Sequence, residues 1–338
     1  MVKSDRPLQK FGGLKLLGTG RALPKRAVSS AELDQLHDFE TGYLHSVTGV
    51  ETRYVCDAED QIELGKQAAV KALSAAGLRP QDLDMIICAS AVPYQPIPAT
   101  APAIQRALGI DDGTCFATDV NSTCLSFPVA LQFASGLLQG GLYNNILIVS
   151  SEIASRALPW NEAPAVAGLF GDGAGAAVVC RDDKAGIVAS SFTTLSSGFD
   201  ACGLASGGTR FDFHKEFELF SKHSLFMMDG KELFRLTARD FGAFVDKLLA
   251  AADTSRNEID CVIAHQASPG ALAHMTRLCG FTQEQVIDIS ATVGNQVAAS
   301  IPFVLDYAFE HGLVREGNRV LILGTSAGVS FGGLVMDL

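Results

Sequence analysis

The chain has 338 residues, of which 48% are hydrophobic and 19% charged, so it is long enough for one large domain or two ordinary ones. Its net charge of −11 argues against a nucleic-acid-binding protein. No apolar run reaches the roughly 18 residues that a membrane-spanning helix needs, and the N-terminus does not resemble a signal peptide. The eight cysteines show neither CxxC pairs nor metal-ligand spacing, which is typical of reduced thiols in a cytoplasmic protein without a bound metal.

Segments typical of strands and helices alternate along the first half of the chain. Strands are expected over 14–17, 83–91, 114–120, 145–151 and 174–179, and helices over 30–36, 61–76, 98–108 and 124–138. The run at 83–91 has no polar face, which indicates a strand buried on both sides, and the run at 114–120 is also expected to be buried. Residues 182–232 are rich in Phe and show no clear pattern. The alternation predicts an α/β fold with mostly parallel sheets.

After about residue 233 the pattern of the first half returns. The segment 126–131 is echoed at 300–305 with an offset of 174 residues, and the same offset carries Asn121 onto Asn295 without a gap. Further echoes in the same order pair 72–87 with 248–263, 106–109 with 277–280, and 146–149 with 320–323. Ordered echoes at nearly one offset indicate two copies of one unit, packed face to face. The two expected units are residues 1–182 and 183–338.

Cys124 lies at the turn between an expected strand and an expected helix. Unpaired backbone N–H groups and the helix dipole favour a thiolate there, and a thiolate is the form that attacks a carbonyl. A lone cysteine would normally be interpreted as buried and inert. Two loops of the second half change this interpretation, because His265 ends the apolar segment 262–264 and Asn295 follows Gly294 before a helix. The duplication brings equivalent strand ends together, so we expect Cys124, His265 and Asn295 to meet.

With these residues, the chain resembles the β-ketoacyl-acyl-carrier-protein synthase III family of thiolase-fold condensing enzymes over nearly its whole length. The segments that carry the resemblance are Asn121-Ser122-Thr123-Cys124, Phe170-Gly171-Asp172-Gly173-Ala174-Gly175-Ala176-Ala177, Met228-Asp229-Gly230-Lys231-Glu232-Leu233-Phe234, Ala264-His265-Gln266-Ala267, and Gly294-Asn295 followed by Ala298-Ala299-Ser300-Ile301-Pro302. The resemblance implies an α/β fold of five layers, α-β-α-β-α, made of two duplicated βαβαβαββ halves. It also implies a homodimer.

The resemblance further implies a catalytic triad of Cys124, His265 and Asn295, with an oxyanion hole made by the backbone N–H groups of Cys124 and Gly328. Cys124 would take an acyl group from an acyl-CoA or acyl-carrier-protein donor. A malonyl thioester, by analogy malonyl on acyl carrier protein, would then lose CO₂, and the resulting enolate would attack the acyl group. His265 and Asn295 would stabilise the enolate, and no metal or redox cofactor would take part.

Several positions depart from the family pattern. Tyr43 replaces a Trp, and Val47 replaces an Arg, in the segment that binds the nucleotide of coenzyme A. Ser268-Pro269-Gly270 replaces Asn-Leu-Arg after the His265 motif. These departures favour a medium-chain or unusual acyl donor, as does Ile97, which is smaller than the Phe that closes the pocket around short acyl groups in the family. A relative in hydrocarbon synthesis has a Glu at the position of Ile97, and the lack of this base favours decarboxylation over direct deprotonation of an acyl thioester. The residues expected to contact substrate are Ile97, Tyr43 and Phe303, and those expected to dock a carrier protein are Arg235 and Arg277.

The sequence also bears on three other functions. A dinucleotide-binding dehydrogenase is disfavoured, because the glycine-rich segment 171–175 lacks the GxGxxG spacing and leads into a strand. A non-catalytic scaffold is disfavoured by the intact triad. An acyltransferase that moves the acyl group from Cys124 to an alcohol or amine, with His265 as base, stays open as the alternative.

Overall fold

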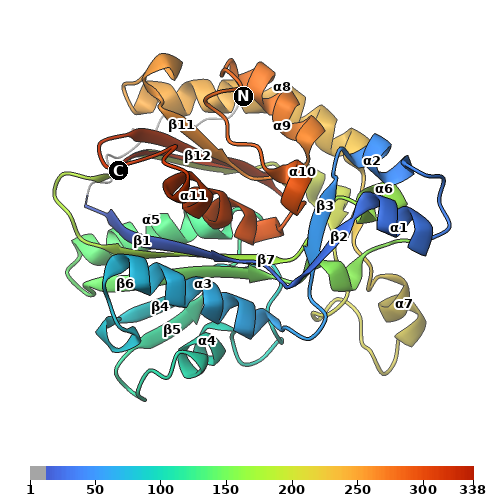
Figure 1. The fold of residues 1–338 in the computed structure, drawn as a ribbon, viewed down its shortest axis with the longest axis horizontal. Helices are drawn as coiled ribbons and strands as arrows, with labels where there is room; N and C mark the ends of the chain where they lie inside the picture. Colours follow the sequence, from blue (N-terminus) through green and yellow to red (C-terminus); the bar gives the residue numbers. More distant parts are fainter. Residues whose placement is uncertain (1–12) are drawn as a thin grey trace.

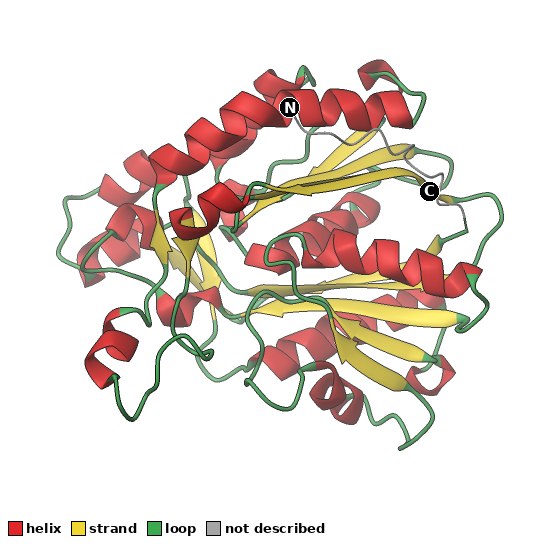
Figure 2. Cartoon of the chain, turned by 180° about the vertical axis from the view of Figure 1, so that it is seen from behind, coloured by secondary structure: helices red, strands yellow, loops and turns green. Residues whose placement is uncertain are grey.

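The computed structural model describes residues 13–338, which form two β-sheets with helices between them and on both outer faces (Figures 1 and 2). The strands of the first sheet are β1 (Lys15–Ala22), β4 (Met85–Cys88), β5 (Phe116–Asp119), β6 (Asn145–Glu152) and β7 (Gly173–Cys180). Those of the second sheet are β8 (Gly186–Thr194), β11 (Cys261–Ala264), β12 (Arg319–Ser326) and β13 (Ser330–Asp337). The strand orders are β1-β7-β6-β4-β5 and β11-β12-β13-β8.

The helices complete five layers. The middle layer holds α5 (Ser126–Gln139) and α11 (Ser300–Glu310), the first sheet is covered by α3 (Gln61–Ala76) and α4 (Ala101–Ala107), and the second by α8 (Gly230–Ala251) and α9 (Pro269–Cys279) (Figure 1). The remaining strands and α-helices are β2 (Arg26–Ser29), α1 (Ser30–Leu36), α2 (Tyr43–Thr48), β3 (Thr52–Val55), α6 (Pro164–Ala167), β9 (Cys202–Gly203), α7 (Phe217–Lys222), β10 (Met227–Met228) and α10 (Ser290–Val293). Of these, β2, β3, α1, α2, α6 and α7 lie together at one end of the layers (Figure 1). No helix within residues 13–338 is long and apolar enough to cross a membrane.

The expected duplication is confirmed by the topology. In each sheet one parallel pair, β4 with β6 or β11 with β12, is followed by two antiparallel strands, β7 and β1 or β13 and β8. All strands of the first sheet come from residues 15–180, and all strands of the second come from residues 186–337. A short parallel bridge between Val262 and Val286 stands where the first sheet has β5.

Local sequence explains the close packing of α3 on the first sheet. The side chain of Asp60 accepts a hydrogen bond from the Glu63 N–H at 2.9 Å and begins the helix, and Gly77 ends it with φ 68°. Gly20 of β1 faces α3, and a Cβ added there would lie 2.3 Å from the carbonyl oxygen of Ala68. The strand and helix therefore approach so closely that only glycine fits.

The two halves share one core. Its middle is formed by Phe127 and Leu131 of α5 against Ile301 and Leu305 of α11, with apolar residues of both sheets around them. Burial of this apolar surface from both halves is the main stabilising contribution to their association.

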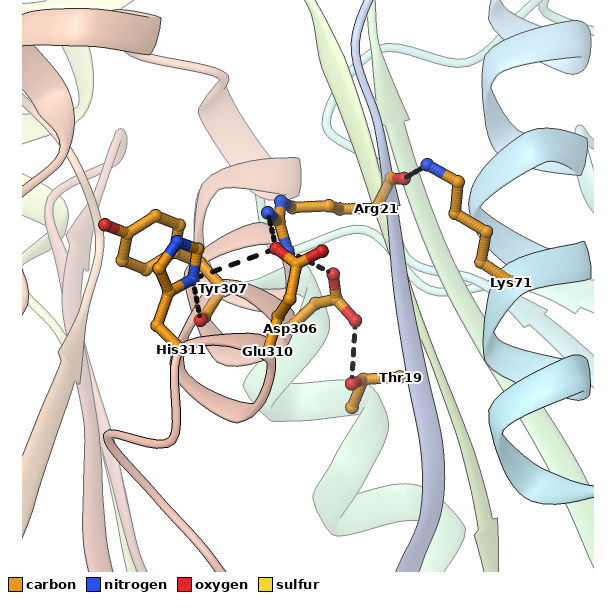
Figure 3. Close-up of polar contacts among 7 residues, drawn as sticks. All are labelled: Thr19, Arg21, Lys71, Asp306, Tyr307, Glu310 and His311. Carbon is orange, nitrogen blue, oxygen red and sulfur yellow. Dashed lines mark hydrogen bonds and ion pairs between the residues drawn. The ribbon is translucent and has the colours of Figure 1, made fainter.

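A polar cluster adds a second link between the halves, and Figure 3 shows its members. Arg21 of β1 donates from Nη1 to Asp306 Oδ2 of α11 at 2.6 Å, and it also pairs with Glu310. Thr19 Oγ1 donates to Asp306 Oδ1 at 2.8 Å. The set Thr19, Arg21, Asp306 and Glu310 is called the Arg21 cluster below. It fixes the position of α11, the helix that begins next to the candidate site.

Two expectations from sequence need correction. The segment 114–120 was expected to be a buried strand, but β5 is the last strand of its sheet and Phe116 is 56% exposed. Apolar composition cannot distinguish a central strand from an edge strand that lacks a neighbour. The helix expected over 124–138 begins at Ser126, which leaves Cys124 two residues outside it.

Candidate active site

Two loops of the same shape hold Cys124 and Asn295. In the first loop, the Thr123 N–H donates to Asn121 Oδ1 at 2.9 Å, and in the second the Val297 N–H donates to Asn295 Oδ1 at 2.9 Å. Thr123 and Val297 both have left-handed backbones, with φ 52° and 51°. A β-branched residue in this region is strained, and such strain is typical of functional turns. The offset of 174 residues therefore relates two copies of one tight turn, 121–124 and 295–298, which are called the first and second elbow below.

The helices after the elbows also begin alike. The Ser126 hydroxyl donates to the Thr123 carbonyl at 2.7 Å, and the Ser300 hydroxyl contacts the Val297 carbonyl at 2.9 Å. At the same offset of 174 residues, Cys124 of the first half corresponds to Ala298 of the second. The thiol of the first elbow thus has a methyl group as its counterpart in the second.

Cys124 is partly buried, and its sulfur is reached by two backbone N–H groups. Burial raises the pKa of Cys124, and the charges of Cys202 and Glu152 raise it further, while hydrogen bonds from the N–H groups of Cys124 and Ala327 lower it. The net direction is upward, which differs from the thiolate expected at a helix terminus. The reason is that Cys124 precedes the first turn of α5, so desolvation outweighs the dipole.

The amide that reaches the sulfur from the last strand turn belongs to Ala327, one residue before the expected Gly328. Gly328 has φ 115° and makes the turn between β12 and β13 possible. Ser326, at the end of β12, donates from Oγ to the Ser122 carbonyl at 2.9 Å. This bond ties the turn to the loop that holds Cys124.

His265 follows β11 and is 7% exposed. The backbone N–H of His265 donates to the Leu323 carbonyl at 2.9 Å, and the ring nitrogen Nδ1 lies 2.6 Å from the Ser300 hydroxyl oxygen. Burial lowers the pKa of His265 to about 4, so the imidazole is neutral at pH 7. A Cβ added at Gly324 would lie 3.1 Å from His265 Cβ and 3.2 Å from Leu125 Cδ2. The structure therefore packs His265 and the neighbour of Cys124 against the same glycine.

Asn295 is 8% exposed and is tied to the loop of His265. Its Nδ2 donates to the Ala267 carbonyl at 3.3 Å, and its N–H donates to the Leu169 carbonyl at 2.8 Å. The long Ala267 contact leaves the other amide hydrogen available to a ligand. The described contacts thus bring the loops of Cys124, His265 and Asn295 together at one end of the middle layer.

Glu152 is a buried acid beside this site that sequence reasoning did not single out. It ends β6, is 1% exposed, and accepts hydrogen bonds from the N–H groups of Ala91 and Val92, and from that of Ala298. Burial raises the pKa of Glu152 to about 8 despite these bonds. The signal for it was an acidic residue directly after the strand expected over 145–151. Its contacts join the loop before Ile97 to the second elbow.

The residues expected to contact substrate lie in different surroundings. Ile97 is 87% exposed, and Tyr43 begins α2 with its ring 5.3 Å from that of Phe39. Phe303 is 2% exposed and its ring lies 5.5 Å from the Arg21 guanidinium. The structure therefore places Phe303 in the core beside the Arg21 cluster.

The two expected docking residues also differ. Arg235 forms a bidentate pair with Glu232, with nitrogen–oxygen distances of 2.7 and 2.6 Å. Its charge is therefore largely compensated on the protein. Arg277 is exposed near the end of α9 and has no ion pair with any residue in 13–338.

Comparison with known proteins gives consistent matches. The family model described as "3-Oxoacyl-[acyl-carrier-protein (ACP)] synthase III" matches residues 118–196, and its C-terminal counterpart matches residues 249–338. The β-ketoacyl-[acyl-carrier-protein] synthase III of Synechocystis sp. is 31% identical over 326 residues, which cover 96% of this chain and 98% of the relative. That of Allorhizobium ampelinum is 32% identical over 328 residues, with coverage of 94% and 97%. The crystal structure of 3-oxoacyl-[acyl-carrier-protein] synthase III from Aquifex aeolicus is 29% identical, covers 96% of this chain and all of its own, and has a TM-score of 0.86.

Proposed function

The chain belongs to the β-ketoacyl-[acyl-carrier-protein] synthase III family of acyltransferases, and from this premise we propose that Cys124 carries the acyl group and that His265 and Asn295 act on the second substrate. A condensing enzyme of this kind needs a nucleophile, a site for a tetrahedral oxyanion and donors for an enolate. The observation that carries the proposal is the packing of His265 and the neighbour of Cys124 on Gly324, which unites residues from both halves.

In the first step Cys124 Sγ attacks the carbonyl carbon of an acyl thioester. The bond from that carbon to the donor sulfur breaks, and the proton lost by Cys124 is found on the released thiol, so one thiol replaces another. The oxyanion that forms needs two N–H donors, and we assign these to Cys124 and Ala327, whose N–H groups reach the sulfur. Ala327 takes the place expected for Gly328.

In the second step a malonyl thioester loses CO₂ and leaves an enolate. The enolate carbon attacks the acyl carbon, the bond to Cys124 Sγ breaks, and the β-ketoacyl product leaves. A neutral His265 N–H and the free Asn295 amide hydrogen are suited to the developing enolate oxygen, because both are buried donors that need no reorganisation. No metal or redox cofactor is assigned to either step.

We assign the acyl carrier protein as carrier of the malonyl group, with Arg277 as the exposed cation that meets its acidic surface. Arg235 is a weaker candidate because Glu232 already neutralises it. Whether coenzyme A or the carrier protein carries the acyl group to Cys124 is decided by comparing the rates with both kinds of donor. The free cysteines among the described residues fit a reducing compartment, which supports a cytoplasmic enzyme.

We also propose a homodimer through the open edge of the first sheet. The outer edge of β5 has no partner strand within residues 13–338, and such an edge normally needs protection. Phe116 of β5 is 56% exposed, and Ile97, in the loop between β4 and α4, is 87% exposed. In a dimer Ile97 of one chain would enter the acyl pocket of its partner, and its small side chain would leave room for medium-chain acyl groups. Light scattering that gave a monomer mass at micromolar concentration would contradict the dimer.

A donor and acceptor panel tests the whole proposal. Acyl-CoA and acyl-carrier-protein donors of increasing length are offered with malonyl-CoA, malonyl-carrier protein, and simple alcohols or amines. We expect CO₂ release and a β-ketoacyl product from malonyl-carrier protein. Esters or amides formed at a higher rate than β-ketoacyl thioester would instead support the alternative acyltransferase.

A further inference from the structure

Ser300 is the polar side chain that contacts Nδ1 of His265. It begins α11, is 1% exposed, and places its hydroxyl oxygen 2.6 Å from His265 Nδ1. A hydroxyl carries a single proton, so this contact has two forms. Either the hydroxyl donates to Nδ1, or Nδ1–H donates to the hydroxyl oxygen.

The choice depends on what else competes for the hydroxyl proton. The Val297 carbonyl lies 2.9 Å from the hydroxyl, but it already accepts the backbone N–H of Ser300. On its acceptor side, the Ser300 oxygen receives the Gln266 N–H at 3.4 Å. In a chain of hydrogen bonds, the Gln266 N–H donates to the Ser300 hydroxyl oxygen and the hydroxyl donates to His265 Nδ1. Each of these groups then has a partner, and the Val297 carbonyl does not need the hydroxyl proton.

The duplicated elbow supplies an internal comparison. Ser126 occupies the position of Ser300 in the first half, where no imidazole stands, and its hydroxyl lies 2.7 Å from the Thr123 carbonyl. Beside the imidazole, the same contact lengthens to 2.9 Å and the contact to Nδ1 becomes the shorter one. The hydroxyl has thus shifted from the carbonyl toward Nδ1.

We propose that Ser300 is a positioning residue that donates its hydroxyl proton to Nδ1 of His265 and so holds the neutral imidazole with its proton on Nε2. The inference rests on the proposed function, since it concerns the donor that faces the enolate. The hydrogen bond at one ring nitrogen decides which tautomer is present at the other.

This tautomer separates the two candidate reactions. An Nε2–H group donates a hydrogen bond to an enolate oxygen, as decarboxylative condensation needs. It has no lone pair at Nε2, so it cannot take the proton of an alcohol or amine that attacks the Cys124 thioester. Ser300 therefore makes the site a condensing site and disfavours the alternative acyltransferase.

The tautomer is measured directly by NMR of the substrate-free protein labelled with ¹⁵N-histidine. The two nitrogens of a neutral imidazole differ strongly in chemical shift, and the His265 signals are assigned by their loss in His265→Asn. We expect the protonated signal at Nε2 in the unmodified protein. Protonation at Nδ1 overturns the proposal, whatever the enzyme catalyses, so its failure is distinct from failure of the proposed function.

Kinetics of two variants test the consequence. Loss of the hydroxyl in Ser300→Ala should slow decarboxylation of malonyl thioester about tenfold or more, since one hydrogen bond of this kind is worth about a factor of ten. Acylation of Cys124 should fall less, and Ser300→Thr, which keeps the hydroxyl, should recover decarboxylation relative to Ser300→Ala. Equal losses in both half-reactions with no recovery in Ser300→Thr would show a merely structural serine, and unchanged decarboxylation in Ser300→Ala would also overturn the proposal.

Discussion

Replacement of Arg21 by Met should weaken the link between the two halves without touching the candidate site. Met keeps much of the apolar stem of Arg21 but removes the guanidinium that pairs with Asp306 (Figure 3). Of the Arg21 cluster, only Thr19 would then contact the Asp306 carboxylate. The side chains of Arg21 and Asp306 are 20% and 15% exposed, so this pair is screened much less than a surface pair.

The magnitude follows from these exposures. Removing one partner of a fully buried pair costs roughly 3–5 kcal/mol, and the partial exposure here reduces this to about 2–3 kcal/mol. The pair with Glu310, whose side chain is 62% exposed, adds less than about 1 kcal/mol. A total of about 3 kcal/mol corresponds to a decrease in Tm of roughly 4 °C for a chain of this length.

Thermal unfolding of a double-mutant cycle with Arg21→Met and Asp306→Asn measures the coupling, which we expect at about 1–2 kcal/mol. Lys71→Met is the matched control, because Lys71 Nζ contacts the Arg21 backbone carbonyl at 2.8 Å from an exposed position and does not pair with Asp306. An unchanged Tm in Arg21→Met, or a loss no larger than that in Lys71→Met, would refute the stabilising role of the Arg21 cluster.

Three further predictions address packing, pH and specificity. Gly20→Ala should prevent stable folding at ordinary temperature, because the new Cβ would lie 2.3 Å from the Ala68 carbonyl oxygen; soluble protein with unchanged Tm would contradict this. Glu152→Gln should flatten the loss of Tm between about pH 4.5 and 8. The raised pKa of Glu152 gives stability that is full below its ordinary 4.5 and is lost as the pH rises through about 8, and an equal loss in both proteins would reject this assignment. Ile97→Phe should shift kcat/KM from medium toward short acyl donors, with roughly 0.8 kcal/mol at stake per buried methylene; acetyl as the best donor of the unmodified enzyme would count against it.

Much of the fold could be predicted because local signals and global topology agree. The bounds of α3 match those expected from sequence, since its apolar period is continuous and Gly77 ends it. The duplicated elbow was visible as the shared offset of Asn121 and Asn295. The edge position of β5 was not visible, because it depends on which strands pair and not on the strand's own composition.

The site was predicted less completely, for a related reason. Ser300 and Glu152 contact residues that are far away in the sequence, and the sequence around each does not indicate which residue it contacts. The N–H that reaches the Cys124 sulfur from the last strand turn belongs to Ala327, because the geometry of one tight turn decides which N–H faces the sulfur. The direction of the Cys124 pKa also depended on burial, which a strand-to-helix pattern does not reveal.

The most direct test of the central claim is mass spectrometry of the acyl-enzyme. The protein is incubated with an acyl thioester, digested and mapped, and malonyl-carrier protein is then added. We expect one acyl mass on the peptide that contains Cys124, none on the peptide with the nearby Cys202, and loss of that mass together with CO₂ release after the addition. Acylation that persists in Cys124→Ala, or an acyl group that malonyl-carrier protein does not discharge, would contradict the account.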